Sequence, residues 1–432
     1  FAPHKVPAYT PSDDVTAGIS LAWKCFARPH DRLPLDILPL TPATLETITS
    51  NPSGSAGLTS YGCTKAASKT RALERGLQTL RKVKQPEPCL AFKRTQFGDK
   101  TRLVWGYPYS MTVIEGLVAY PLIQRFKRGT TPMAFAMPSG ALGTKLRVAS
   151  YHKKYAYSID MSQFDANVGA KLIHIAFKVL KTWFKLDQVE PTSGCTVREV
   201  FDLIEHYFIH TTIVMPDLRI YIGKDHGVPS GSFFTQMIDS VVNTIAAGAI
   251  SSRFKLNIDR RELFVLGDDL LFWSNRKMDL DHIALWVRDN LHLIMHGSEK
   301  SKVYRYDEAI HFLGRDWSNG LPDLDEEGIL ARMVYPESFR RYSRDPETKR
   351  KQLRMMILSY AATYRKAWRI AYDLLDGSGR NIHKGCANLD RNTYYIKAPV
   401  EEVDPDHLSG LQRFRVKYLY QKVAGDIPIT AT

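Results

Sequence analysis

The sequence predicts an α+β fold in which helices flank a small antiparallel sheet. Apolar residues recur at helical spacing in several segments, most clearly in residues 166–184. Short β-prone runs lie between these segments, and residues 264–273 are typical of a β-hairpin with a Gly-Asp turn. The chain has 432 residues and 44% hydrophobic content. It is therefore long enough to bury a large core in roughly two to three structural units.

The charge balance favours a polyanionic partner such as nucleic acid. The chain carries 59 Lys and Arg against 45 Asp and Glu, a formal net charge of +14. Its five cysteines form no CxxC pair, so the sequence indicates neither a disulfide framework nor a zinc site, and a reducing compartment fits best. No apolar run reaches the roughly 18 residues of a membrane span, and no signal peptide is recognisable. We expect a soluble intracellular protein.

The amino-terminal part is predicted to contain few regular elements. Residues 1–50 are rich in proline and are expected to form an irregular wrapping arm, with one short helix near 43–49. Residues 51–62 carry three glycines and three serines, which is typical of a flexible loop. A basic-faced helix at 65–83, two short strands within 93–105 and a helix at 113–126 are expected to follow.

A strand at residues 155–159 is expected to end at Asp160 and to lead, through a loop carrying Asp165, into the helix at 166–184. The later elements are a helix at 197–210, a hairpin of 213–215 and 218–222, a glycine-flanked turn at 227–231 that leads into a helix ending near 249, the hairpin at 264–273, a helix near 281–291, strands at 302–306 and 310–313, and a mostly helical last hundred residues with an apolar stripe over 353–371.

Two adjacent carboxylates, Asp268 and Asp269, lie at the tip of the predicted 264–273 hairpin. Asp160, at the end of another strand, would suit the same site if the two strands are neighbours. Oxygen ligands from separate elements can hold Mg²⁺, and two divalent ions neutralise charge on the attacking and leaving oxygens in phosphoryl transfer. These acids therefore predict a metal-dependent phosphoryl-transfer site. Asp165 fits either this site or an ordinary helix N-cap.

Three motifs, in order along the chain, resemble motifs A, B and C of viral RNA-dependent RNA polymerases. Residues 160–165, Asp-Met-Ser-Gln-Phe-Asp, match the DxxxxD of motif A; Ser230 and Gly231 with Thr235 match motif B; residues 267–269, Gly-Asp-Asp, match motif C. The stretch GVPSGSFFTQMIDS is particularly similar to the polymerases of small double-stranded RNA viruses, the partitiviruses and picobirnaviruses.

Four further motifs are recognisable, and the resemblance spans roughly residues 50–320. It implies a right-hand polymerase fold of fingers, palm and thumb. Residues 55–57 resemble motif G, Lys93-Arg94 with 100–105 motif F, 295–301 the end of motif D, and 312–315 motif E. The implied division is 1–105 for the fingers with the amino-terminal arm, 106–186 for the first part of the palm, 187–226 for a fingers insertion, 227–320 for the second part of the palm, and 321–432 for the thumb and carboxy-terminal tail.

The resemblance also implies roles for individual residues. Asp160, Asp268 and Asp269 would be catalytic and would ligate two Mg²⁺ or Mn²⁺ ions. Lys300 would donate a proton to the departing pyrophosphate. Asp165 would sense the ribose 2′-hydroxyl of the incoming nucleotide. The remaining nucleotide contacts would be Lys93, Arg94, Lys100 and Arg102 to the triphosphate, and Ser230, Gly231 and Thr235 in a pliable template and nucleotide loop.

Motif B departs from its commonest form at one position. Where the family usually has Asn, four residues after Thr235, this chain has Asp239, and the nearest asparagine is Asn243. Asp239 and Asp165 could share a proton or an ordered bridge, because two close carboxylates seldom both stay ionised. Alternatively, Asn243 could take over the hydrogen bond to the ribose, since it lies one helical turn later on the same face.

The expected function is template-directed RNA synthesis in the replication and transcription of a viral RNA genome. The implied partners are an RNA template and product duplex, nucleoside triphosphates and viral capsid protein, and the implied location is the host cytoplasm, inside the virion. A reverse transcriptase shares the palm, but the glycine before the paired acids and the basic strand with Lys100 and Arg102 favour an RNA product. A non-catalytic basic RNA-binding or packaging protein would explain the charge, but it would not need these acids at these spacings.

Overall fold

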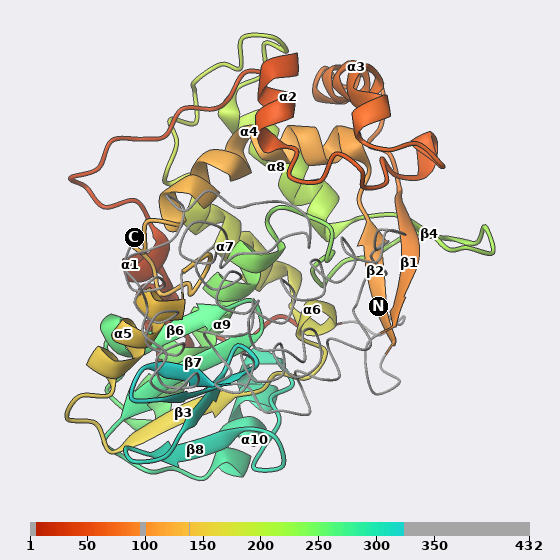
Figure 1. Ribbon diagram of the computed structural model, residues 1–432. Helices are drawn as coiled ribbons and strands as arrows, with labels where there is room; N and C mark the ends of the chain where they lie inside the picture. The colour runs from red at the N-terminus through yellow and green to blue at the C-terminus, as the bar shows by residue number, and fades with distance from the viewer. Residues whose placement is uncertain (1–5, 96–100, 138, 324–432) are drawn as a thin grey trace, which may run out of the picture. The chain divides into compact units, whose positions relative to one another are not determined.

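The computed structural model describes residues 6–95, 101–137 and 139–323 of the chain (Figure 1). The chain divides into two compact units. The first comprises Phe1–Arg94, Thr101–Ala136 and His152–Asp307, and the second comprises Thr95–Lys100, Met137–Tyr151 and Glu308–Thr432. The segments that resemble motifs A, B, C, D and G all lie in the first unit.

The central sheet of the first unit has the strand order β6-β7-β3-β8, and all its neighbouring pairs are antiparallel. Strands β6 and β7 form the predicted hairpin, and β3 is the predicted strand before Asp160. The stacked rings of Tyr157 and Phe272, 4.9 Å apart, join β3 to β7. The bounds are Tyr155–Ile159 for β3, Leu263–Leu266 for β6, Asp269–Ser274 for β7 and Lys302–Arg305 for β8.

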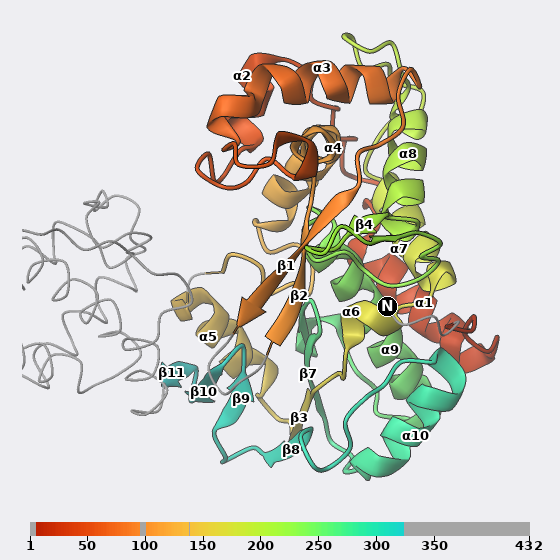
Figure 2. The same cartoon turned by 90° about the vertical axis from the view of Figure 1, so that its right-hand side faces the viewer.

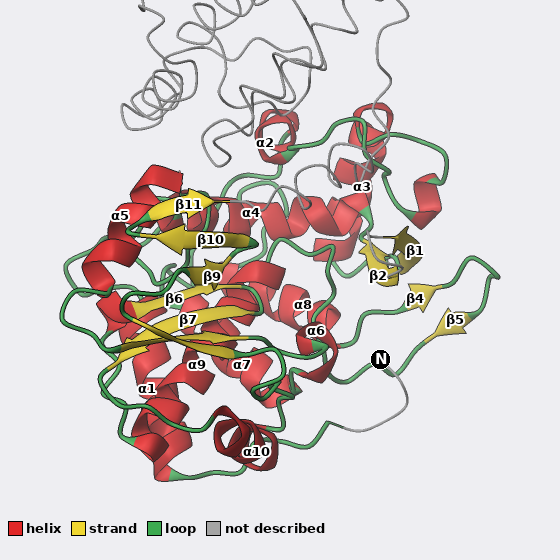
Figure 3. Cartoon of the chain, turned by 60° about the horizontal axis from the view of Figure 1, so that its bottom comes forward, coloured by secondary structure: helices red, strands yellow, loops and turns green. Residues whose placement is uncertain are grey.

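Helix α9 (Thr235–Phe254) lies along one face of this sheet, where it contacts β6 and β7 (Figure 3). Its residues from Met237 to Ile250 are all buried, so it is a core helix that is apolar on most sides. Helices α7 (Ala170–Lys181) and α10 (Leu280–Leu291) also pack against α9. The sequence predicts all three helices, but it predicts α7 as part of one continuous helix over 166–184.

The prediction of one continuous helix over 166–184 was wrong, because the helix is interrupted between α6 (Phe164–Asn167) and α7. At the break, Gly169 pairs with His226 in an antiparallel bridge, and the Val168 carbonyl accepts a hydrogen bond from the Gly227 N–H at 2.8 Å. Pairing with the segment before motif B therefore overrides the helical periodicity of the sequence.

The prediction of an irregular amino-terminal arm over residues 1–50 was also wrong, because Asp13–Phe26 forms helix α1. Ser12 caps its first turn by accepting a hydrogen bond from the Val15 N–H, and α1 packs along α9. Two glycines allow this close approach: a Cβ added to Gly248 would lie 2.8 Å from the Gly18 Cα, and one added to Gly18 would overlap the Ile245 carbonyl.

A second sheet of the first unit has the order β2-β1-β4-β5 and joins distant parts of the sequence. Strands β1 (Cys89–Thr95) and β2 (Thr101–Gly106) run side by side (Figure 2), and β1 pairs in parallel with β4 (Ile213–Val214). The remaining elements of the unit are β5 (Ile220–Tyr221), α2 (Pro42–Ile48), α3 (Lys69–Leu80), α4 (Tyr109–Phe126), α8 (Val197–Ile209), and the short 3-10 helices Leu58–Ser60, Ala66–Ser68 and Arg260–Glu262.

In the second unit, the described elements are one helix and a three-stranded antiparallel sheet of order β11-β10-β9. The turn between β9 and β10 contains Leu313 and Gly314, both at positive φ, within the segment that resembles motif E. The bounds are Ser139–Ala149 for α5, Ile310–Phe312 for β9, Arg315–Ser318 for β10 and Leu321–Asp323 for β11. The sequence does not predict α5, β10 or β11, and the predicted helical stripe over 353–371 lies outside the described residues.

Within the described part of the chain, Cys25, Cys63, Cys89 and Cys195 are free thiols. None of the helices described is both long enough and apolar enough to cross a membrane.

Candidate active site at the tip of the β6–β7 hairpin

The register of the central sheet brings the predicted acids to one end of adjacent strands. Ile159 of β3 pairs with Leu270 of β7, so Asp160 leaves β3 where Asp269 enters β7. Asp268 lies in the tight turn between β6 and β7. All three acids are exposed. The structure therefore joins, at one edge, acids that are more than a hundred residues apart in the sequence.

The loop after α10 holds the backbone of Asp160. The Asp160 N–H donates to the Ser301 hydroxyl at 3.1 Å, and its carbonyl accepts from the His296 N–H at 2.9 Å. The His296 Nε2 lies 3.6 Å from the Asp160 Oδ2, and the Asp160 side chain remains 52% exposed. The carboxylate is thus oriented by its neighbours but open to a ligand.

His296 is a site residue that the sequence analysis missed. Its Nε2 lies 3.0 Å from the Lys300 Nζ, and its Nδ1 lies 2.9 Å from the Glu299 Oε1. The structure thereby places Lys300, the residue implied to protonate pyrophosphate, next to the histidine that contacts Asp160. The available signal was the position of His296 inside the segment that resembles motif D.

Buried polar residues of α9 hold the turn that carries Asp268. The Ser240 hydroxyl accepts from the Gly267 N–H at 3.1 Å. The Asn243 amide donates to the Gly267 carbonyl at 3.1 Å and to the Asp268 carbonyl at 3.0 Å. Asn243 is fully buried, and its amide nitrogen positions the hairpin turn; its hydrogen bond to the ribose stays a prediction.

The structure brings the Asp239 and Asp165 side chains together, as the first of the two alternatives for motif B requires. Asp239 is 2% exposed, and burial raises its pKa well above its ordinary value. The negative charges of Asp165 and Asp268 and a hydrogen bond with Asp165 raise this pKa further. Because a hydrogen bond between two carboxyl groups requires a proton on one of them, the pair shares a proton.

The alternative role of Asp165 as a helix N-cap was wrong. The residue at the N-cap of α6 is Gln163, in the left-handed conformation, and Asp165 lies inside the helix. The Asp165 carbonyl accepts from the Val228 N–H at 2.6 Å, just before the motif B turn. Motif A and motif B are therefore joined by backbone as well as by side chains.

The motif B loop lies against β2, the strand that resembles motif F. The Ser230 hydroxyl accepts from the Trp105 N–H at 3.2 Å. A Cβ on Gly231 would overlap the Trp105 carbonyl, so this position requires glycine. The Thr235 hydroxyl donates to the Pro229 carbonyl at 2.7 Å and to the Ser232 carbonyl at 3.0 Å, closing the loop onto the start of α9.

Glu115 of α4, a second residue that the sequence analysis missed, clamps the same loop. The Ser232 hydroxyl donates to its carboxylate oxygens at 2.8 and 2.9 Å, and the Phe233 N–H donates at 2.8 Å. Glu115 is fully buried, and this burial raises its pKa to about 7, against the lowering effect of these hydrogen bonds. The position lies in an apolar helix with no motif around it, so the sequence carried no signal.

The basic residues implied to bind the triphosphate are only partly described. Lys93 and Arg94 lie in strand β1, and Arg102 lies in strand β2. Their side chains and the whole of Lys100 lie outside what the structure describes. The motif G segment is described: the Ala56 carbonyl accepts from the Tyr109 N–H at 3.0 Å, directly after β2.

The donor set at the sheet edge fits a divalent cation such as Mg²⁺. Among the described residues, no group of three or more His, Cys, Asp or Glu side chains is arranged so that it could hold a metal ion. Exposed carboxylates from adjacent strands are present instead. Mg²⁺ commonly binds in this way, through one or two carboxylates, with waters and substrate phosphates completing its coordination.

Comparison with known proteins identifies the family. The family model described as "Viral RNA-dependent RNA polymerase" matches residues 98–366, more than half of the chain. The chain is 32% identical over 217 residues to the RNA-directed RNA polymerase of Cryptosporidium parvum virus 1 (strain KSU-1), covering 46% of this chain and 39% of the relative. It is 24% identical over 275 residues to that of White clover cryptic virus 1, covering 57% and 44%. The matches thus span less than half the length of these relatives.

Solved structures share the fold. The RNA-dependent RNA polymerase of a human picobirnavirus superposes with a TM-score of 0.66 at 17% identity, covering 89% of this chain and 73% of that one. The Sicinivirus 3Dpol RNA-dependent RNA polymerase gives a TM-score of 0.67 at 14% identity, covering 96% and 87%. These likenesses confirm the predicted right-hand α+β fold. With the matching family model, they show that this chain belongs to the viral RNA-dependent RNA polymerase family.

Proposed function

We propose that this chain catalyses template-directed RNA synthesis from nucleoside triphosphates. The observation that carries the proposal is the sheet register that joins Asp160 to the turn holding Asp268, beside a loop built from motif B. The membership of the family supports the same reaction. A pair of Mg²⁺ or Mn²⁺ ions, when bound, would neutralise charge on the attacking and leaving oxygens.

The residues of this chain would contribute position and charge. Asp160 and Asp268 would hold the cations, with Asp269 supporting, because their carboxylates are exposed at one sheet edge. Asp165, paired with Asp239, would face the ribose of the incoming nucleotide. Lys300 would donate the proton to pyrophosphate from its place beside His296.

The decisive test is replacement of the two principal acids. We expect Asp160→Asn and Asp268→Asn each to lower nucleotide incorporation by about 10²-fold or more, because each removes a charged ligand of the reacting centre. RNA binding should persist, since neither acid grips phosphate. Asp187→Asn, a side chain 94% exposed in the loop after α7, is the matched control and should keep wild-type activity. Full incorporation by either active-site variant would exclude the mechanism.

Two other readouts separate the alternatives. A reverse transcriptase would extend with deoxyribonucleotides on the same template, whereas we expect a strong preference for ribonucleotides. A non-catalytic packaging protein would bind RNA and show no turnover with any divalent ion. We further propose capsid protein as a partner and the virion in the host cytoplasm as the location, on the resemblance to polymerases of small double-stranded RNA viruses; co-purification with virus particles tests both.

A further inference from the structure

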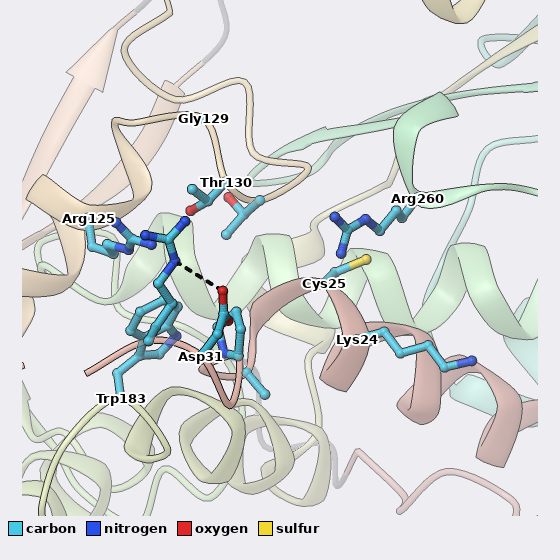
Figure 4. Close-up of a pocket in the computed structure, with 12 residues that line it drawn as sticks. Lys24, Cys25, Asp31, Arg125, Gly129, Thr130, Trp183 and Arg260 are labelled. Carbon is cyan, nitrogen blue, oxygen red and sulfur yellow. Dashed lines mark ion pairs between the residues drawn. The ribbon is translucent and has the colours of Figure 1, made fainter. Parts of the chain in front are cut away.

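A pocket of about 380 Å³ lies in the first unit, apart from the paired acids. It is bounded by the end of α1, the end of α4 and the residues that follow α7 (Figure 4). Arg260, one of its lining residues, precedes β6, whereas Asp268 follows that strand. The length of β6 alone, roughly 13 Å, therefore separates the pocket from the proposed catalytic centre.

The lining of this pocket is strongly cationic. Lys24, Arg32, Arg125 and Arg260 line it, and Asp31 is the one acidic residue among the lining residues. Asp31 and Arg32 form an exposed ion pair at 3.9 Å, drawn as the dashed line in Figure 4. The four positive side chains therefore outnumber the single carboxylate by three.

Arg125 is held in place and incompletely satisfied. Its guanidinium carbon lies 5.3 Å from the ring centre of Trp183, and the Trp183 Nε1 donates to the Phe26 carbonyl at 2.7 Å, which fixes the ring. The Nε of Arg125 is buried and donates to no acceptor in the described residues. Burial and the positive charges of Arg32 and Arg128 lower the pKa of Arg125, and an anion would relieve that repulsion.

We propose that this pocket binds a terminal oligophosphate group, of the kind carried by a nucleoside triphosphate or by the 5′ end of an RNA. The volume lies within the range of about 300–1,000 Å³ found for small-molecule sites. The guanidinium groups of Arg32, Arg125 and Arg260 in this lining suit a compact, multiply charged phosphate. A diester backbone, with one charge per nucleotide, is instead bound along extended grooves. This site goes beyond the proposed polymerase reaction and does not depend on it.

The test measures binding of sodium tripolyphosphate to the purified full chain by isothermal titration calorimetry, with EDTA present so that no divalent ion contributes. We expect Arg125→Gln combined with Arg260→Gln to weaken the interaction at least tenfold. Lys171→Gln combined with Lys178→Gln is the matched control, because it removes the same charge from the exposed face of α7. This control should bind as wild type does.

Arg260→Gln alone guards against misfolding, because this side chain is exposed and its loss should leave the melting temperature unchanged while still weakening binding. Comparing a 5′-triphosphorylated RNA with the same RNA bearing a 5′-hydroxyl, and with GTP, then shows which source of the group is preferred. Preference for the triphosphorylated end or for GTP supports the proposal. Equal tripolyphosphate binding by wild type and by the Arg125 and Arg260 variants, or no binding by wild type, would overturn it.

Discussion

Asp239 stands where the family usually has asparagine in motif B, and its surroundings explain how an acid can serve there. It is buried, it shares a hydrogen bond with Asp165, and its pKa is raised well above its ordinary value, first by burial. A protonated carboxyl group carries one donor, which is the function that an asparagine amide can also supply. A protonated Asp239 would therefore act as a neutral donor to Asp165.

Replacing Asp239 tests whether this position needs a neutral hydrogen-bond donor or a charged carboxylate. We expect Asp239→Asn to keep the preference for ribonucleotides over deoxyribonucleotides, because the amide still donates to Asp165. Asp239→Ala should lower this preference by about tenfold, the worth of one lost hydrogen bond. Incorporation of the two nucleotide classes on one template measures the ratio. An equal loss in both variants would show that the acid itself is needed.

Glu115 gives a pH-dependent contribution to stability. Its folded pKa of about 7 lies above the ordinary value of 4.5, so the stabilisation by the protonated group is full below about pH 4.5 and is lost as the pH rises through 7. The loss over this window is on the order of 3 kcal/mol. The ionisable neighbours of Glu115 are Tyr107, Tyr207 and Cys89, which burial keeps neutral here.

Glu115→Gln should therefore be less sensitive to pH than the wild type. We expect the apparent melting temperature of the variant, relative to wild type, to rise between pH 5 and pH 8. Glu74→Gln, on the exposed face of α3, provides the control and should follow the wild-type curve. Parallel curves for wild type and Glu115→Gln would contradict the assigned pKa.

At the scale of elements, α1 supports the helix that holds the turn of the proposed active site. Helix α9 carries Ser240 and Asn243, which bind the turn at Gly267, and α1 packs along α9 on contacts that leave no room for a side chain at Gly18. A residue far from the site in sequence thus governs how closely its scaffold packs.

Gly18→Ala should destabilise the protein by about 1–3 kcal/mol, the usual cost of overpacking, because the added methyl group meets the backbone of α9. Denaturant unfolding measures the change. Ser20→Ala, on the exposed side of α1, is the control and should alter stability little. If Gly18→Ala left the free energy of unfolding unchanged, α1 and α9 could move apart to admit the methyl group without loss of stability.

At the scale of the whole molecule, the net charge of +14 predicts how RNA binding depends on salt. Each phosphate that the protein neutralises releases bound counterions, so affinity falls as salt rises. The charge acts on any RNA sequence. We therefore expect it to set affinity and association rate, whereas the proposed catalytic acids would set turnover.

We expect RNA affinity to fall by about 10³ to 10⁵ between 50 and 200 mM salt if six to ten phosphates are contacted, as is usual for such proteins. Fluorescence anisotropy with two unrelated RNA sequences measures the slope, which should be the same for both. Asp160→Asn should share this slope, since it removes no phosphate contact. A flat salt response would show that phosphate contacts do not dominate binding.

The sequence by itself determined the family resemblance, the fold class and the positions of Asp160, Asp268 and Asp269. These features are local: the motifs are short, and the hairpin and the strand before Asp160 follow from apolar patterns in a few neighbouring residues. Alternation of strand and turn was enough to predict that acids would lie at strand ends.

Only the tertiary structure decided what surrounds these acids. Glu115 holds Ser232 and Phe233, more than a hundred positions along the chain. His296, in the loop after α10, contacts Asp160, and Asn243 holds the backbone of the β6–β7 turn. The break after α6 and the packing of α1 likewise depend on partners distant in sequence. Such contacts leave no local period or spacing, because the free energy that selects them comes from burial and hydrogen bonding between segments that meet only in the folded chain.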